Sequence, residues 1–314
     1  MTSLKVLAMG ASMPENIMTN DDLSTMVDTD DEWIFSRTGI HSRHIAPEGY
    51  TNAGQTETAC RQALERAGVT AEDIDLLVVA TITPDNFTPS VSATVHDNLG
   101  MRSDVLAFDV NAACSGFLVA MRVALGQLNI MKPGSKALVV GSELMSHLLD
   151  FSDRSTCVLF GDGAGAAVVT LSDEDCWLCG GACGSHDVLV SRAWYEGETP
   201  GVYMDGRAVF RFATESITRS INNLLEQSGL SLEDVDHVVC HQANARIIKH
   251  VIKSLKADPE KFFMNVEHMG NTSAASIPLA LEEMSTRGIL KPGDRVLLAG
   301  FGAGLTEGGM LFTW

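Results

Sequence analysis

Short runs of almost wholly apolar residues recur along the chain and predict buried β-strands. The runs LLVVA from Leu76, HVVC from His237 and AAVVTL from Ala166 are rich in β-branched side chains. Runs of this kind, without alternating polar residues, are typical of strands covered on both faces of a sheet. The first residues, MTSLKVLAMGASM, predict a further strand, because they lack the basic region and the long apolar region of a signal peptide.

Helical patterns separate these runs. Segments 116–127 and 276–288 predict helices, and two other helices are predicted to end at Gly68 and Gly229. Glycine favours helix ends because it adopts the left-handed backbone conformation without steric cost. Strands that alternate with helices predict an α/β fold with largely parallel sheets.

The second half of the chain repeats the first. LERAGVTAEDID from Leu64 matches LEQSGLSLEDVD from Leu225, and KPGSKALVVG from Lys132 matches KPGDRVLLAG from Lys291. The two matches have nearly the same offset. A solenoid would repeat every 20 to 50 residues or so, whereas this much longer period predicts two copies of a whole domain.

The length of the chain, 314 residues, also suits two domains. We expect the boundary near Thr170–Asp175, where AAVVTL gives way to acidic SDED. The predicted domains are therefore residues 1–172 and residues 173–314.

Charge and composition exclude several classes of protein. The chain has 22 Lys and Arg against 40 Asp and Glu, a formal net charge of −18, whereas nucleic-acid binding requires clustered basic residues. No apolar run approaches the roughly 18 residues of a membrane-spanning helix. Seven cysteines, an odd number, do not suit a secreted disulfide framework. We therefore expect a soluble cytoplasmic protein that binds neither nucleic acid nor membrane.

Three residues carry candidate chemistry. Cys114 lies between the predicted strand VLAFDV and helix 116–127, where the helix N-terminus would favour a thiolate. His241 follows the strand HVVC, and Asn271 precedes helix 276–288. Ligands gather beyond the carboxyl ends of strands, so the repeat would bring the three residues to one crevice. The alternatives are a core cysteine, an ordinary buried or surface histidine and a helix-capping asparagine.

Two other motifs resemble cofactor or metal sites. GDGAGAA from Gly161 fits the dinucleotide pattern, but the predicted strands STCVLF and AAVVTL flank it, so we interpret it as a hairpin-like turn. Cys176, Cys179, Cys183 and His186 form C-x2-C-x3-C-x2-H, yet the first two would point to opposite faces of a strand. We expect no metal and no cofactor. The glycine-rich GFGAGLTEGG could offer backbone N–H groups to an oxyanion.

A basic stripe follows His241 on an amphipathic helix. Its members recur every three or four residues and are Arg246, Lys249, Lys253 and Lys256. The simpler interpretation is a solvated helix face. On a chain this acidic, the stripe also suits an acidic partner or a phosphate-bearing substrate.

The sequence resembles the β-ketoacyl-acyl carrier protein synthase III enzymes of the thiolase superfamily. The matching stretches follow in order along almost the whole chain: DEWIFSRTGIHSRH, DVNAACSGF, VVGSEL, DRSTCVLFGDGAGAAVV, HQANARI, HMGNTSAAS and GFGAGLTEGG. The resemblance implies a thiolase-like, duplicated α/β/α/β/α layered fold with two pseudo-symmetric halves. It also implies an acyltransferase that initiates fatty acid biosynthesis by decarboxylative condensation of a short acyl-CoA primer with malonyl-acyl carrier protein.

The resemblance assigns a role to each candidate residue. Cys114 would be the acylated nucleophile, with His241 and Asn271 as partners in condensation, and the backbone N–H groups of Cys114 and Ala303 would form the oxyanion hole. Coenzyme A, a substrate rather than a cofactor, would contact Trp33, Arg37, Arg154 and Asn244. The acyl pocket would include Phe87, Leu159, Phe210 and Phe301. Phe87 would reach the partner subunit of a homodimer, and the basic stripe would meet the acidic carrier protein.

Two departures and three rival functions accompany this assignment. Glu307 stands where the family commonly has Trp, and the segment between Gly184 and Tyr203, with Arg192 and Trp194, is shorter than usual; both bear on primer size and cofactor fit. One rival is a related ketosynthase that uses another acceptor in polyketide or secondary metabolism. A non-catalytic binding protein is the second. A degradative thiolase, the third, is discounted because no cysteine follows Cys240.

Overall fold

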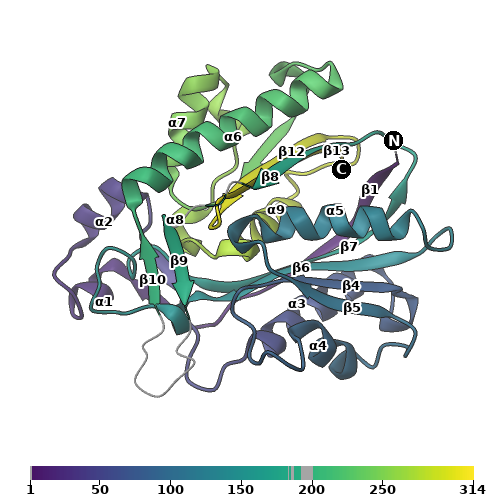
Figure 1. The fold of residues 1–314 in the computed structure, drawn as a ribbon, viewed down its shortest axis with the longest axis horizontal. Helices are drawn as coiled ribbons and strands as arrows, with labels where there is room; N and C mark the ends of the chain where they lie inside the picture. Colours follow the sequence, from purple (N-terminus) through teal and green to yellow (C-terminus); the bar gives the residue numbers. More distant parts are fainter. Residues whose placement is uncertain (1, 183, 185–186, 192–200) are drawn as a thin grey trace.

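Two β-sheets and three layers of helices stack alternately in the protein (Figure 1). A computed structural model describes residues 2–182, 184, 187–191 and 201–314. Helices α3 and α4 cover the outer face of the first sheet, α5 and α9 lie between the sheets, and α6 and α7 cover the second. This order is the α/β/α/β/α arrangement that the resemblance implied. The helices are α1 Asn20–Ser24, α2 Asp31–Thr38, α3 Asn52–Ala67, α4 Val91–Leu99, α5 Gly116–Leu128, α6 Gly206–Ser228, α7 Ala245–Leu255, α8 Val266–Met269 and α9 Ser276–Thr286.

Both main sheets are mixed. The first has the order β1-β7-β6-β4-β5, with parallel pairing only among β6, β4 and β5. The second has the order β11-β12-β13-β8, with parallel pairing only between β11 and β12. The strands are β1 Ser3–Ser12, β4 Leu76–Ala80, β5 Leu106–Val110, β6 Lys136–Leu144, β7 Asp162–Ser172, β8 Trp177–Ala182, β11 His237–Cys240, β12 Arg295–Gly302 and β13 Thr306–Thr313.

The prediction of largely parallel sheets is therefore wrong for about half of the pairings. Only residues 303–305 join β12 to β13, and no α-helix lies between β6 and β7. Without a crossover helix, a strand that follows its neighbour returns antiparallel to it. Two small antiparallel pairs complete the fold: β2 Ile17–Thr19 with β3 Ser42–His44, and β9 Val188–Ser191 with β10 Gly201–Met204.

The two halves have equivalent strand orders. Strands β8, β13, β12 and β11 occupy in the second sheet the places of β1, β7, β6 and β4 in the first. The counterpart of β5 is reduced to an isolated parallel bridge between Val238 and Phe262. β7 ends at Ser172, and the next strand, β8, belongs to the other sheet. We retain the boundary between residues 172 and 173 as a proposal.

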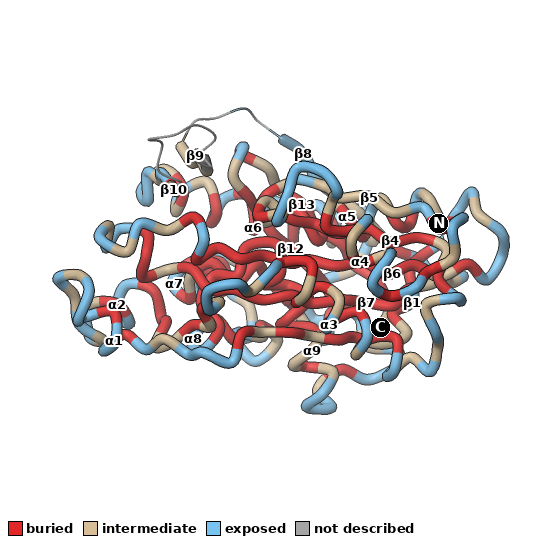
Figure 2. Tube along the Cα trace, turned by 90° about the horizontal axis from the view of Figure 1, so that it is seen from below, coloured by how far each residue is buried: buried red, intermediate tan, exposed pale blue. Residues whose placement is uncertain are grey.

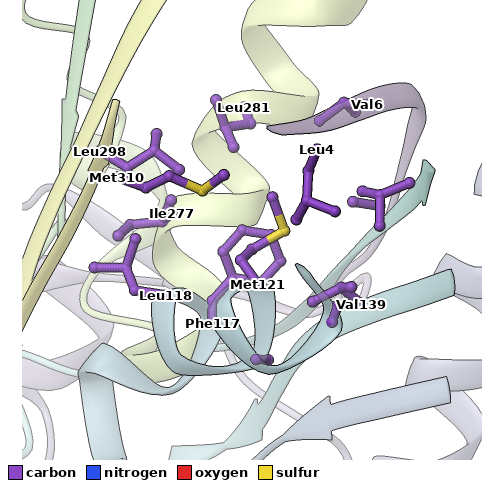
Figure 3. Packing of buried hydrophobic residues seen from close by; sticks show 14 of the residues in the cluster. Leu4, Val6, Phe117, Leu118, Met121, Val139, Ile277, Leu281, Leu298 and Met310 are labelled. Atoms are coloured by element: carbon purple, nitrogen blue, oxygen red, sulfur yellow. The ribbon is translucent and has the colours of Figure 1, made fainter. Parts of the chain in front are cut away.

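The largest core cluster fills the space between the two sheets. Phe117, Leu118 and Met121 of α5 meet Ile277 and Leu281 of α9, with residues of the two sheets on either side of them (Figure 3). Because α5 packs between two sheets, it is apolar around most of its surface. Figure 2 shows the buried strands through the centre of the molecule and the exposed residues mainly at loops and outer helices.

Helix ends follow the sequence signals closely. Gly68 ends α3 at φ 67° and Gly229 ends α6 at φ 69°, both in the left-handed conformation that was predicted. The helices predicted over 116–127 and 276–288 are α5 and α9. The predicted amino-terminal strand is β1.

The strand predicted for STCVLF is wrong. Residues 155–159 form turns, and Phe160 makes only an isolated bridge to Asn271. Gly163 and Gly165, which follow, are not in a hairpin-like turn but in β7 itself, which begins at Asp162. Their close approach to another backbone is real, since a Cβ at Gly165 would lie 2.7 Å from the Cβ of Pro278 in α9. Glycine is required there because α9 packs directly on the strand.

Candidate active site

Two short turns, one from each half, meet at the centre of the molecule. The 3-10 turn η2, Ala113–Ser115, precedes α5, and its repeat mate η6, Ser273–Ala275, precedes α9. Each begins with a residue in the left-handed region, at φ 47° for Ala113 and φ 50° for Ser273. Glycine is required on the strands that cross them, because a Cβ at Gly141 would collide with η6 and a Cβ at Gly302 would crowd η2.

A narrow pocket opens beside these turns, with a volume of about 170 Å³. The three candidate residues Cys114, His241 and Asn271 all line it, as do Ser273 and Ala303. Most of the remaining wall is apolar. The structure therefore brings together residues that are up to 157 positions apart in the sequence, as the repeat predicted.

The prediction that the helix N-terminus lowers the pKa of Cys114 is wrong. Burial raises the pKa of the thiol to about 12, and the nearby Glu143 carboxylate raises it further. The neighbouring Ser273 hydroxyl lowers the pKa of the thiol but does not compensate for burial. Desolvation outweighs the helix because the dipole contributes only about 1 kcal/mol within the first turn. Desolvation therefore favours the protonated form of the Cys114 thiol.

His241 is a neutral hydrogen-bonding group. Burial lowers its pKa to about 3, so the imidazole stays uncharged near neutral pH. Its Nδ1 lies 2.6 Å from the Ser276 hydroxyl, and that oxygen also accepts the Gln242 N–H. The hydroxyl can therefore donate its hydrogen to Nδ1, which leaves the proton on Nε2. The Nε2 atom is buried without a hydrogen-bond partner among the described residues, and is available to a ligand.

Asn271 and Ala303 complete the polar lining. The Oδ1 atom of Asn271 accepts the Ser273 N–H at 2.9 Å, so its NH2 group is left for a ligand. The peptide groups of Asn271 are held by Leu159 and Gly161, which fixes the residue beside the pocket. Ala303 follows β12 directly and lines the same pocket as Cys114. A backbone N–H at each of the two positions suits the predicted oxyanion hole.

Three of the four predicted acyl-pocket residues line this pocket, namely Leu159, Phe210 and Phe301. Phe87 does not. It is 67% exposed and lines a neighbouring groove of about 700 Å³ along β5. Its role toward a partner subunit stays a prediction.

The residues expected to contact coenzyme A cluster at the outer end of α2. The guanidinium groups of Arg37 and Arg154 lie 4.5 Å and 4.9 Å from the ring centroid of Trp33. Arg154 also donates to the Asp28 carbonyl at 2.7 Å. An adenine can enter between Trp33 and Arg154 only if this guanidinium moves. Asn244 lines the pocket, caps α7 and donates to the Arg37 carbonyl at 3.1 Å, which joins the cluster to the pocket.

The basic stripe lies on α7, which begins after Asn244. The side chains of Arg246, Lys249 and Lys253 are exposed, as is Lys256 at the end of the helix. The opposite face is buried against the second sheet. Arg246 stacks 5.9 Å from the ring of Phe210, a wall residue of the pocket. The stripe therefore begins beside the pocket entrance and leads away from it.

Glu307 lies away from this pocket. It pairs with Arg219 of α6 and lines a separate cavity beneath α5, so its carboxylate does not contact the acyl-pocket residues. The expected effect of Glu307 on primer size is therefore not supported. Cys183, His186, Arg192 and Trp194 lie outside the described residues.

Sequence reasoning missed Ser273, Ser276 and Glu143. Ser273 lines the pocket together with Cys114, and its hydroxyl donates a hydrogen bond to Glu143. Ser276 hydrogen-bonds His241 and so orients its imidazole. Each lies in a motif that was noted, HMGNTSAAS or VVGSEL, but serine and glutamate there gave no chemical signal by themselves. Alignment of η2 with η6 would have singled out Ser273, because its mate is Ala113.

The described residues offer neither a metal site nor a membrane-spanning helix. Over the described ranges, no three His, Cys, Asp or Glu residues are close enough to hold a metal ion. Since Cys183 and His186 are outside those ranges, the expectation of no metal stays a prediction. No described helix is both long and apolar enough to cross a membrane.

Comparisons with known proteins agree over the whole chain. The family described as 3-Oxoacyl-[acyl-carrier-protein (ACP)] synthase III matches residues 108–185, and its C-terminal part matches residues 225–314. Beta-ketoacyl-[acyl-carrier-protein] synthase III of Clostridium botulinum (strain Kyoto / Type A2) is 42% identical over 330 aligned residues, which cover 100% of this chain and 99% of the relative.

Solved structures agree as well. The 3-oxoacyl-[acyl-carrier-protein] synthase III of Aquifex aeolicus VF5 has a TM-score of 0.92 at 40% identity, over 99% of this chain and 100% of that one. The priming β-ketosynthase of the R1128 polyketide biosynthetic pathway has a TM-score of 0.92 at 38% identity, over 99% and 96%. Fold and similarity together define a thiolase-like condensing enzyme. The chain belongs to the 3-oxoacyl-[acyl-carrier-protein] synthase III family.

Proposed function

We propose that Cys114 takes an acyl group from a short acyl-CoA and that this group then condenses with malonyl-acyl carrier protein. Through its family, the chain is an acyltransferase that initiates fatty acid synthesis. The observation that carries the assignment to residues is the shared pocket of Cys114, His241 and Asn271. A thiol, a neutral imidazole and an amide are the groups that thioester exchange and enolate stabilisation need.

In the first step, the Cys114 sulfur attacks the thioester carbonyl of acyl-CoA. The Cys114 thiol gives its proton to a base as the new carbon–sulfur bond forms. The bond to coenzyme A breaks, and coenzyme A leaves as a thiolate that takes a proton from water. The backbone N–H groups of Cys114 and Ala303 stabilise the oxyanion. Trp33, Arg37, Arg154 and Asn244 hold the coenzyme.

In the second step, His241 and Asn271 act on the malonyl thioester. The Nε2–H of His241 and the NH2 group of Asn271 donate to the thioester carbonyl, so loss of carbon dioxide gives a stabilised enolate. The enolate carbon attacks the acyl carbonyl, and the Cys114 thiolate leaves. A neutral imidazole supports this role, because burial lowers the pKa of His241 to about 3.

Intact-mass measurement after incubation with acetyl-CoA tests the nucleophile. One acetyl group is expected on the wild-type protein and none on Cys114→Ala. Cys179→Ala is the matched control, since Cys179 is another free and partly exposed cysteine, and this variant should be acetylated normally. An adduct that persists in Cys114→Ala would overturn the assignment.

Recruitment of the carrier protein and dimer formation complete the proposal. The exposed cations of α7 suit an acidic carrier and lead to the pocket through Arg246.

The strand β5 is an edge of the first sheet, with Leu106 44% exposed, and an antiparallel copy of the same strand would extend the sheet. A cytoplasmic location stays a prediction.

A second candidate function is supported by the 38% identity to the R1128 priming β-ketosynthase. That similarity allows a starter unit to be joined to the acceptor of a polyketide pathway. Product analysis with malonyl groups carried by fatty-acid or polyketide carrier proteins separates the two functions. Faster turnover with the fatty-acid carrier is expected from the 42% identity to the curated synthase III.

A further inference from the structure

The Ser273 hydroxyl lies between the Cys114 pocket and a buried carboxylate, that of Glu143. Glu143, near the end of β6, is 0% exposed. Its Oε1 atom accepts the hydrogen of the Ser273 hydroxyl at 3.1 Å, and Ser273 lines the same pocket as Cys114. Because Ser273 gives its hydrogen to Glu143, its lone pairs are available to the hydrogen of the thiol. Ser273 therefore lies where it can pass a proton between the thiol and Glu143.

Neutral donors surround the other carboxylate oxygen. Oε2 accepts from the hydroxyls of Thr83 at 2.7 Å and Thr81 at 3.2 Å, and from the Ile82 N–H at 3.1 Å. From α3, the side chains nearest to this part of β6 are Asn52 and Gln55, which are uncharged. No cation compensates the carboxylate in these contacts. The titratable group facing it from the pocket side is the Cys114 thiol.

The backbone of η6 is held in an uncommon conformation at this point. Ser273 has a φ of 50°, a region that costs a non-glycine residue about 1 kcal/mol. Its repeat mate, Ala113, has a φ of 47° and precedes Cys114. The two halves thus share the backbone conformation, and only the second adds a hydroxyl, which lies between the thiol and Glu143. The fold itself does not need that hydroxyl, because alanine adopts the same conformation in the first half.

We propose that Ser273 and Glu143 accept the proton of the Cys114 thiol during acyl transfer, hold it, and return it when the thiolate leaves. This inference rests on the proposed function. As the carbon–sulfur bond forms, the thiol proton passes to the Ser273 oxygen while the serine hydrogen passes to Glu143 Oε1. In the condensation, the bond between Cys114 and the acyl carbon breaks, and the same path returns the proton to sulfur. In this path Ser273 contacts the reacting atom, and Glu143 acts through it.

The acid–base strengths of the groups agree with this path. Burial raises the pKa of the Cys114 thiol to about 12, so the protonated form is favoured and a base would assist its attack. His241, with a pKa of about 3, is a weak base. Burial raises the pKa of Glu143 to about 7, which suits a group that must both accept and return a proton near neutral pH.

Single-turnover acylation by acetyl-CoA, followed by intact mass from pH 5.5 to 8.5, tests the inference. In the wild type, the rate should rise with pH through an inflection near 7, because only ionised Glu143 can accept the proton. Glu143→Gln and Ser273→Ala should lose this inflection and react roughly 100-fold more slowly at pH 7.5. Gln keeps the shape of the side chain and its hydrogen bond from Ser273 but cannot take up a proton.

Thr272→Ala is the matched control. Thr272 precedes Ser273, its hydroxyl is buried without a hydrogen-bond partner among the described residues, and its repeat mate is Ala112. This variant should keep the wild-type rate and pH profile. If it shifts the profile as Ser273→Ala does, the effect is structural and the path is wrong.

The remaining outcomes distinguish failure of the proton path from failure of the proposed function. Wild-type rates and profiles in both Glu143→Gln and Ser273→Ala would overturn the path while the acyl-enzyme stands. Failure of the wild type to be acylated would instead overturn the proposed function. Thermal unfolding is measured for each variant. If Glu143→Gln does not fold, Ser273→Ala decides, because the chain already accepts alanine in this conformation at Ala113.

Discussion

At the scale of the residue, the pocket separates a nucleophile from its hydrogen-bond donors. The Cys114 thiol comes from the first half, while His241 and Asn271 come from the second. His241 has its Nδ1 engaged by Ser276 and its Nε2 without a partner among the described residues. This asymmetry fits a fixed donor rather than a base, so thiol acylation and decarboxylation should depend on different side chains.

Replacement of His241 by alanine should spare acylation and stop condensation. We expect the rate of 3-oxoacyl product formation to fall roughly 100- to 1,000-fold, the usual cost of losing one oxyanion donor, because the enolate loses its imidazole N–H. Acetylation of Cys114 should stay within a few-fold of wild type. His96→Ala on α4, far from the pocket, is the control. Equal loss of both steps in His241→Ala would contradict this division of roles.

At the scale of the element, α7 carries two functions on two faces. Its apolar face completes the core of the second half, while its exposed cations and the cap residue Asn244 face solvent and pocket. The bulk charge of the chain, −18, repels an acidic carrier, so attraction must be local. Contacts between exposed charges are screened beyond about 10 Å at 0.1 M salt, so recruitment should be weak and sensitive to salt.

Charge reversal on α7 should affect the carrier protein and not the small thioester. For Arg246→Glu with Lys249→Glu, we expect kcat/KM for malonyl-acyl carrier protein to fall at least about tenfold, with a weaker dependence on salt. The rate of acetylation by acetyl-CoA should change little. Lys5→Glu with Lys291→Glu gives the same change in net charge at exposed positions elsewhere. A similar loss in this control would show that net charge, not α7, is responsible.

At the scale of the whole molecule, β5 is an edge strand of the first sheet, and a second copy of the chain could pair with it. Leu106 and Phe87 are both exposed beside the groove that β5 lines, and Ala113 and Ala303 of the pocket border the same groove. A second copy placed there would close the groove next to the pocket. The acyl pocket would then be complete only in the dimer.

A charged residue on this edge should separate the subunits. Leu106→Glu would bury a carboxylate in the proposed interface, so sedimentation at micromolar concentration should change from dimer to monomer. Burial of an unpaired charge is costly enough to outweigh the apolar contact that is lost. Ile130→Glu, at an apolar position that is 80% exposed, should remain dimeric. A monomeric wild type, or an unchanged mass for Leu106→Glu, would contradict the proposal.

The sequence by itself determined the features that depend on local patterns. Apolar runs located β4, β7 and β11, glycines located the ends of α3 and α6, and the repeat placed Cys114 and Asn271 at equivalent junctions before α5 and α9. These signals are reliable because strand burial and helix termination act within a few residues. The sequence motifs along the chain added the resemblance to the synthase III family.

Only the tertiary structure decided how these pieces interact. Pairing directions in the sheets depend on how short loops return the chain, which turned the predicted parallel order into a mixed one. Desolvation by both halves raised the pKa of Cys114, although the local sequence favoured a lower one. The contact of Ser273 with Glu143 joins residues 130 positions apart. Burial and long-range contact are properties of the packed chain, and no local pattern contains them.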